Sequence, residues 1–151
     1  MASLKIDSTS SEIYRLLGRV RDELNDPAGA SEAFKRAIVL DERDVWSMNN
    51  LARVSIGQGK FVEALGPLAR AIEIDSTVAA FRNNLGIALE RTGHITQATD
   101  AYRSALAIDS TYQKAAANLA RVGTLRQDST ITPLDLSSLA RSFVEQVKTW
   151  P

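Results

Sequence analysis

The same residue types recur every 34 positions along most of this chain. A fixed period of this length indicates a repeat array, in which each unit packs against its neighbours instead of around one centre. Such an array acts through an extended surface, so a binding surface is sought before a catalytic pocket. The clearest columns are leucine at Leu17, Leu51, Leu85 and Leu119, alanine at Ala37, Ala71 and Ala105, and aspartate at Asp41, Asp75 and Asp109.

The composition argues against several classes of function. Lys plus Arg and Asp plus Glu each total 18, and this zero net charge argues against a general nucleic-acid binder. The absence of cysteine excludes disulfides and thiolate metal sites, and the single histidine excludes a multi-histidine site, so we expect no metal and no cofactor. The sequence has no run of about 18 apolar residues, so we expect no membrane insertion. Its start lacks the features of a signal peptide, which makes the cytoplasm the default location.

Each repeat predicts two helices joined by a tight turn. In the second unit, helical spacing of apolar and small residues runs from 45 to 56, Gly57-Gln58-Gly59 breaks it, and a broad apolar face follows from 61 to 74. The third unit repeats this pattern at 79–91 and 95–108. The predicted organisation is an array over 10–126, with units at about 11–44, 45–78 and 79–112 and a partial unit at 113–126.

Some places depart from the regular pattern. A capping box of Thr9 and Glu12 predicts that the first helix of the first unit starts near residue 10. Gly66-Pro67 lies inside a predicted helix and predicts a local bend. Residues 1–9 are either an N-terminal cap or the remnant of an earlier repeat, because Leu4-Lys5-Ile6-Asp7 resembles Leu106-Ala107-Ile108-Asp109.

After the partial unit, the chain no longer follows the 34-residue period. The second helix of that unit is missing from the pattern, and 127–132 is a polar linker. A helix is predicted within 133–151, because Pro133 can start one and an apolar stripe follows. This helix either folds back over the apolar face of the last repeat or docks on another copy and produces homo-oligomers. Its stripe consists of Leu136, Leu139, Ala140, Phe143, Val147 and Trp150.

These columns resemble the tetratricopeptide repeat. The third unit carries the family's pattern as Leu85-Gly86, Gly93, Ala98, Tyr102 and Ala105. The resemblance covers about residues 10–126. It implies an all-α, right-handed superhelical solenoid of about three full helix-turn-helix units and a partial fourth, to which the predicted C-terminal amphipathic helix is added.

The resemblance also implies that the first helix of each unit lines a concave face that binds peptides or proteins. Three asparagines stand 34 apart in that lining, and amides of this kind can hold the backbone of an extended peptide or bond to neighbouring helices. Three basic residues would add positive charge, and a tryptophan would add an aromatic anchor. In the first unit the inward positions hold Glu12, Arg15, Arg19, Asp22 and Glu23. The predicted peptide-binding residues are the column Asn50, Asn84 and Asn118, with Asn49, Asn83, Arg53, Arg121, Lys114 and Trp46.

Some members of the family hold the terminal carboxylate of heat-shock chaperones in a clamp of two lysines, two asparagines and one arginine. Asn50, Asn84 and Lys114 match three of these places. Trp46 and Asn118 stand where a lysine and the arginine would be, so the clamp is incomplete in this sequence.

No arrangement of residues points to catalysis. The aspartates recur because the repeat recurs, and the sequence has no phosphate-binding loop and no nucleophile elbow. The favoured hypothesis is a non-catalytic scaffold whose concave face binds a peptide or protein segment. The alternatives are a self-assembly module that uses the repeat ends and the C-terminal helix, and the recognition arm of a larger enzyme.

Overall fold

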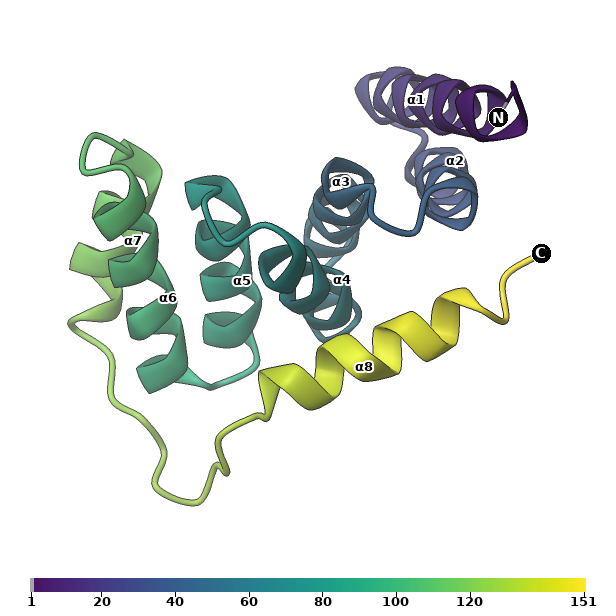
Figure 1. Cartoon of the computed structure of the whole chain (residues 1–151). Coiled ribbons are helices and arrows are strands. Elements are labelled where there is room, and N and C mark those ends of the chain that lie inside the picture. Colours follow the sequence, from purple (N-terminus) through teal and green to yellow (C-terminus); the bar gives the residue numbers. More distant parts are fainter. Residues whose placement is uncertain (1) are drawn as a thin grey trace.

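The computed structural model describes residues 2–151, with side chains from Ser10 onward, and every regular element in that part of the chain is a helix. The first six helices form three antiparallel pairs stacked side by side, α7 follows the third pair, and α8 runs along α4 (Figure 1). The predicted all-α repeat fold is confirmed. The helices are α1 (Ala2–Glu23), α2 (Pro27–Leu40), α3 (Val45–Gly57), α4 (Phe61–Ile74), α5 (Ala79–Arg91), α6 (Ile95–Ile108), α7 (Gln113–Val122) and α8 (Leu136–Val147).

The start of α1 differs from the sequence prediction. The helix begins at Ala2, so Thr9 and Glu12 lie inside it and do not open it. The predicted cap or repeat remnant at residues 1–9 falls on side chains outside the described part of the chain. Helix α2 begins at Pro27, which suits a first turn because it has no N–H to leave unpaired.

The turns inside the three pairs share one backbone conformation. Asn25, Gly59 and Gly93 each have a positive φ, of 59°, 76° and 88°, and stand one repeat apart. Asparagine tolerates this left-handed conformation better than most residues other than glycine. The first pair therefore keeps the same kind of turn as the others.

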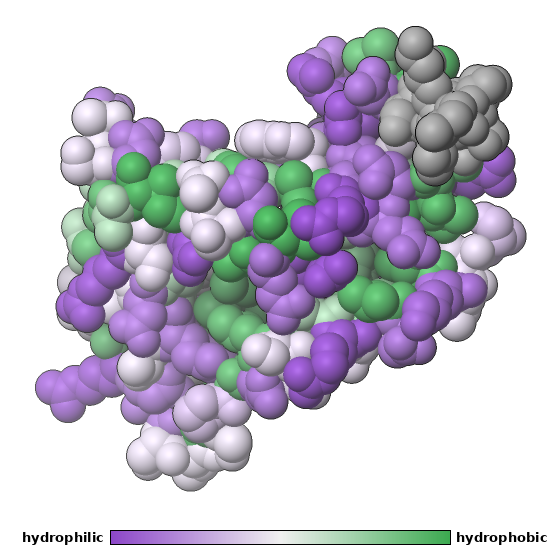
Figure 2. All heavy atoms as spheres, in the orientation of Figure 1, coloured by the Kyte–Doolittle hydropathy of each residue, from purple (hydrophilic) through white to green (hydrophobic). Residues whose placement is uncertain are grey.

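Small residues let the helices approach one another at the centre of the array. Figure 2 shows hydrophobic residues in the middle of one face, around α4 and α5, bordered by hydrophilic ones. Because a single pair cannot bury its own apolar side, stacking of neighbours supplies most of the stabilisation. The alanine columns Ala30, Ala64, Ala98 and Ala37, Ala71, Ala105 are fully buried, and the bulky residues Phe34, Met48, Leu68, Phe81 and Tyr102 fill the space around them.

The fourth unit is shorter than predicted. Helix α7 ends at Val122, four residues before the predicted end at Arg126. Residues 123–135 carry no helix and lead to α8. The side chain of Gln97 on α6 anchors this segment, because its amide nitrogen donates to the Leu134 carbonyl and its oxygen accepts from the Leu134 N–H, each at 2.9 Å.

Helix α8 packs on α4 and, over a smaller area, on α2 of the same chain. The prediction that it covers the last repeat is therefore wrong, and the stripe predicted to join copies packs inside the chain, with Phe143 and Val147 buried. A Cβ at Gly66 would lie 3.2 Å from the Cβ of Phe143, so glycine permits this close approach. The equivalent positions of the other units hold the exposed acids Glu32 and Asp100. Helix α4 also continues through Pro67 without a break.

Candidate functional site

The first helices of the units line a groove of about 480 Å³, which we call the inner groove. Helices α1, α3 and α5 form most of its wall, and the start of α7 completes it. Residues from successive first helices line the groove together, so the units extend one continuous surface. Its lining residues are Arg15, Arg19, Trp46, Asn49, Asn50, Arg53, Ala80, Asn84, Tyr112 and Lys114.

The inner groove is basic although the chain as a whole has no net charge. Four cations line it and no carboxylate does. One of them, Arg15, is committed to the buried Asp44 by an ion pair of 2.6 Å between Nη1 and Oδ1. Arg19, Arg53 and Lys114 are exposed and form no ion pair with any residue whose side chain is described. Positive charge in the inner groove is therefore available to a ligand.

Two aromatic side chains stand among these cations. Trp46 is 47% exposed, and its ring meets Phe81 edge to face with centroids 5.0 Å apart. Packing on Phe81 fixes the indole while leaving one side open to solvent. Tyr112 also lines the inner groove although the sequence did not predict it, because it precedes α7 and lies outside the inward positions of the first helices. Burial raises the pKa of Tyr112, so its hydroxyl stays protonated at neutral pH.

The predicted asparagines bond mainly to one another. Asn84 Nδ2 donates to Asn49 Oδ1 at 2.8 Å, and Asn118 Nδ2 donates to Asn83 Oδ1 at 2.9 Å. These pairs join α3 to α5 and α5 to α7, which is the interhelical role that the sequence left open. The inner groove includes Asn49, Asn50 and Asn84 but not Asn83 or Asn118. The column of three amides is therefore split by the structure.

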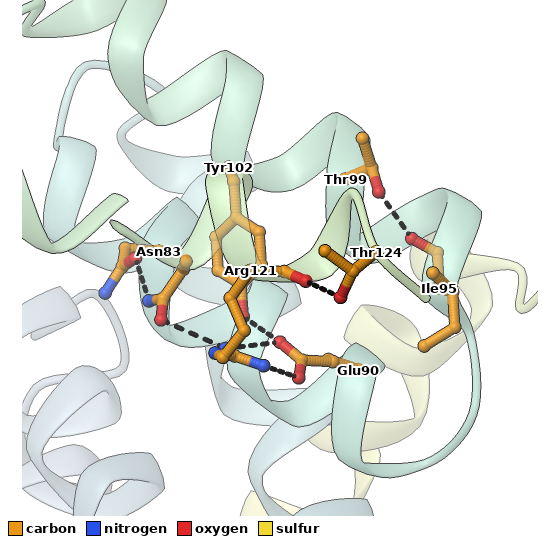
Figure 3. Close-up of polar contacts among 8 residues, drawn as sticks. Asn83, Glu90, Ile95, Thr99, Tyr102, Arg121 and Thr124 are labelled. Carbon is orange, nitrogen blue, oxygen red and sulfur yellow. Dashed lines mark hydrogen bonds and ion pairs between the residues drawn. The ribbon is translucent and has the colours of Figure 1, made fainter. Parts of the chain in front are cut away.

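Arg121 was predicted to add charge to the concave face, and the structure binds it to Glu90 instead. Both guanidinium Nη atoms donate to the Glu90 carboxylate, with Nη2 to Oε1 at 2.8 Å (Figure 3). Nη2 also donates to Asn118 Oδ1 at 3.1 Å, and the Tyr102 hydroxyl donates to Glu90 Oε1 at 2.9 Å. These contacts form a polar network across α5, α6 and α7, which we call the Glu90 network.

The protonation states of the Glu90 network follow from its contacts. Hydrogen bonding from Arg121 lowers the pKa of the Glu90 carboxyl, although burial opposes the shift. Burial, and then the neighbouring carboxylate, raises the pKa of Tyr102, so its hydroxyl remains a donor. The same bond to Glu90 raises the pKa of Arg121. The Glu90 carboxylate is therefore ionised at neutral pH, and the guanidinium of Arg121 compensates its charge.

The described residues also bear on metals and membranes. Among them, no three His, Asp or Glu side chains are grouped in a way that would hold a metal ion. No helix in residues 2–151 is long and apolar enough to cross a bilayer.

At the level of sequence, a family model described as tetratricopeptide repeat matches residues 15–79. No curated protein matches the chain.

Solved structures of low sequence identity share the fold. The first TPR of Spaghetti (RPAP3), bound to the HSP90 peptide SRMEEVD, has a TM-score of 0.75 at 15% identity, covering 77% of this chain and 92% of that one. The TPR2B domain of yeast Sti1, in a complex with pHsp70, has a TM-score of 0.75 at 19% identity, covering 79% and 100%. The O-GlcNAc transferase of Thermobaculum terrenum has a TM-score of 0.74 at 18% identity, covering 93% of this chain and 26% of that one.

Proposed function

We propose that this chain, whose residues 15–79 match the tetratricopeptide-repeat family, is a non-catalytic interaction module that binds an acidic peptide segment in the inner groove. The observation that carries this proposal is the charge of the groove. Arg19, Arg53 and Lys114 face solvent without ion-pair partners among the described residues, and no carboxylate lies in the lining. A surface that carries charge of one sign attracts ligands of opposite charge and repels ligands of like charge.

The rest of the lining suits a peptide. Asn50 offers an amide with two donors and one acceptor to an extended backbone, and Asn84 keeps one N–H and its oxygen after donating to Asn49. Trp46 supplies a rigid apolar surface for one large side chain. Cations, amides and an aromatic ring together favour a peptide that carries several carboxylates and at least one apolar residue.

Similar folds support the same class of ligand. The Spaghetti domain was solved with a peptide, SRMEEVD, that carries three acidic side chains. The inner groove of this chain contains Asn50, Asn84 and Lys114, three of the places expected for a carboxylate clamp, but Trp46 replaces a lysine and Asn118 lies outside the groove. We infer that Arg19 and Arg53 supply the charge that the incomplete clamp lacks.

A binding experiment tests the proposal directly. Fluorescein-labelled SRMEEVD is titrated with the full chain and compared with SRMQQVN carrying an amidated C-terminus, by fluorescence anisotropy. We expect measurable binding of the acidic peptide alone, with affinity that falls as salt rises because exposed charges are screened. The R19Q/R53Q/K114Q variant should bind SRMEEVD at least about tenfold more weakly, since it loses the charge-assisted contacts.

A matched variant distinguishes binding in the inner groove from a nonspecific effect of the protein's net charge. R103Q/R126Q/R141Q removes the same number of positive charges from exposed positions outside the lining. It should retain nearly all of the affinity. Equal affinity for the two peptides, or equal losses in the two triple variants, would contradict the proposal.

One observation favours the alternative that the chain is the recognition arm of a larger enzyme. The chain resembles about a quarter of the O-GlcNAc transferase chain, so a module of this fold occurs within an enzyme. Under that alternative the inner groove would still select acidic segments, and it would deliver them to a catalytic domain. The full-length gene sequence would decide it, because a fused catalytic domain would be visible there.

A further inference from the structure

The Glu90 network has a counterpart at the other end of the array. Three of its residues, and the glycine beside Tyr102, have counterparts two repeats earlier in the chain. The corresponding pairs are Gly18 with Gly86, Asp22 with Glu90, Phe34 with Tyr102, and Arg53 with Arg121.

The two places share the same local frame. A Cβ at Gly86 would lie 2.5 Å from Cε1 of Tyr102, and a Cβ at Gly18 would lie 2.5 Å from Cε1 of Phe34. In each unit the ring of the second helix therefore packs directly on a glycine of the first helix. Asp22, Phe34 and Arg53 line one cavity, so the structure brings together the residues that stand in the register of Glu90, Tyr102 and Arg121.

The side chains that complete the network are shortened in the N-terminal copy. Asp22 has one methylene fewer than Glu90, and Phe34 lacks the hydroxyl that Tyr102 donates. Among the described side chains, Asp22 and Arg53 form no ion pair. A cavity of about 190 Å³ lies between them, lined by Arg19, Asp22, Glu23, Phe34, Asn50 and Arg53.

The middle copy shows that this place is variable. Ile56, Leu68 and Ile87 stand at the positions of Glu90, Tyr102 and Arg121; Leu68 is buried in the apolar core, and Ile56 and Ile87 are partly buried against it. The array thus contains three versions of one place: closed by an ion pair, filled by apolar side chains, and open beside an arginine.

We propose that the cavity beside Arg53 is a subsite for a glutamate side chain of the bound peptide. The ligand carboxylate would meet Arg53 as the Glu90 carboxylate meets Arg121, with Arg19 and the amide of Asn50 as further donors. Asp22 and Glu23 also line the cavity, so its two arginines and two carboxylates sum to no net charge, and the attraction for a ligand carboxylate comes from direct donation by the arginines and Asn50. Three of the lining residues, Arg19, Asn50 and Arg53, also line the inner groove, which makes the cavity a branch of it. This inference rests on the proposed binding of acidic peptides.

The test lengthens one acidic side chain that lines the cavity and leaves the net charge of the cavity unchanged. Asp22→Glu adds the missing methylene, so its carboxylate reaches Arg53 and occupies the place offered to the ligand. We expect D22E to weaken binding of SRMEEVD by about tenfold, and to change binding of SRMQQVD by less than about twofold, because a glutamine does not compete for the arginine. Such non-additivity between protein and peptide changes is the signature of a direct contact.

Two further variants control the experiment. R53Q should remove the preference for SRMEEVD over SRMQQVD, and D100E, the same lengthening at an exposed aspartate outside the cavity and the inner groove, should alter neither affinity. D22E should unfold at the same temperature as the wild type or higher, which excludes misfolding as the cause of weaker binding.

Each outcome has one meaning. If the wild type prefers SRMEEVD but D22E binds both peptides like the wild type, the subsite is wrong and the groove proposal stands. Equal weakening of both peptides in D22E also overturns the subsite. If the wild type binds SRMEEVD and SRMQQVD equally but amidated SRMQQVN more weakly, the subsite is wrong and the groove proposal stands; if all three peptides bind equally, both proposals fail.

Discussion

The two ends of the array use the same repeat positions to opposite effect. At the C-terminal end, Glu90 is bound by Arg121 and Tyr102, and the place is closed. At the N-terminal end, Asp22 takes the place of Glu90, and a cavity remains beside Arg53. The two copies differ by one methylene at Asp22 and one hydroxyl at Phe34, and also in Arg19 and Glu23, which stand where the C-terminal copy has Ile87 and Arg91. The comparison teaches that, on a repeated frame, a few side-chain changes decide whether a polar position holds helices together or stays open to a ligand.

The closed copy lies where the array lacks a packing partner. Helix α7 is followed by irregular chain instead of a second helix, so one side of the last unit has no helix packed on it. The Glu90 network ties α7 to α5 and α6 through Arg121 and Asn118. Helix α7 also carries Lys114 at the edge of the inner groove. The network therefore contributes indirectly to the shape of that groove.

The largest expected effect comes from the glycine on which the aromatic ring packs in both copies. G86A places a methyl group 2.5 Å from the Tyr102 ring and should lower the free energy of unfolding by about 2–3 kcal/mol. The middle unit pairs Ala52 with Leu68, so adding Tyr102→Leu should recover part of the overpacking cost. Urea denaturation of the single and double variants measures both changes. A G86A protein as stable as the wild type would contradict the close packing of the Tyr102 ring on Gly86, on which the comparison of the two copies depends.

The next effect separates the closed copy from the open one. E90Q removes the ion pair to Arg121 and should lower the free energy of unfolding by about 1 kcal/mol, a value that allows for the exposure of the arginine. The same change at the open copy, D22N, should cost less than about 0.5 kcal/mol, because Asp22 has no ion-pair partner among the described side chains. Thermal or urea unfolding of the two variants gives the comparison. Equal losses would mean that the open copy is closed in solution.

The pH dependence sharpens the same contrast. The pKa of Glu90 is lowered in the folded state, so its stabilisation is complete above the unfolded pKa and is lost as the pH falls through the folded pKa. The difference in unfolding free energy between wild type and E90Q should therefore be full at pH 7 and shrink steadily below about pH 4. Urea midpoints at pH 7, 5, 4 and 3 follow it. A difference that grows towards acid pH would contradict the assignment.

The smallest effect concerns the hydroxyl alone. Tyr102→Phe removes one hydrogen bond to Glu90 and should cost about 0.5–1 kcal/mol. Phe34→Tyr combined with Asp22→Glu should rebuild the network at the open end and gain a similar amount. Differential scanning calorimetry of the two proteins tests whether the copies can be interconverted. No gain in the rebuilt protein would show that the two frames differ.

The sequence predicted the parts of the fold that repeat. The columns around Leu51, Ala71 and Asp75 specify helix positions because each unit must bury the same face against the next. Helices α3 to α6 agree with prediction to within one residue. The site was harder to predict, because the concave positions are variable and their contacts depend on the neighbouring unit. Register alone could not tell that Arg121 is bound to Glu90 while Arg53 is open.

The non-repeating end was predicted least well. The stripe from Leu136 to Trp150 revealed an amphipathic helix but not the surface that it covers. A signal was present in Gly66, a glycine where the other units have acids, but it was interpreted as a bend inside α4. Glycine at one unit of an otherwise acidic column marks the place where another helix approaches. The start of α1 at Ala2 shows in the same way that a capping pattern such as Thr9 and Glu12 does not fix the start of a helix on its own.

The position of α8 has a mechanical consequence. It spans the second helices of two neighbouring units, and Lys35 of α2 lies 5.3 Å from the centre of the Trp150 ring just beyond its end. The helix therefore splints the second helices of the first two units from outside. The last units are held in another way, by the Gln97 contacts to Leu134 and by the Glu90 network. A ligand held between α1 and α3 meets two units that α8 already joins, so little conformational freedom has to be lost there on binding.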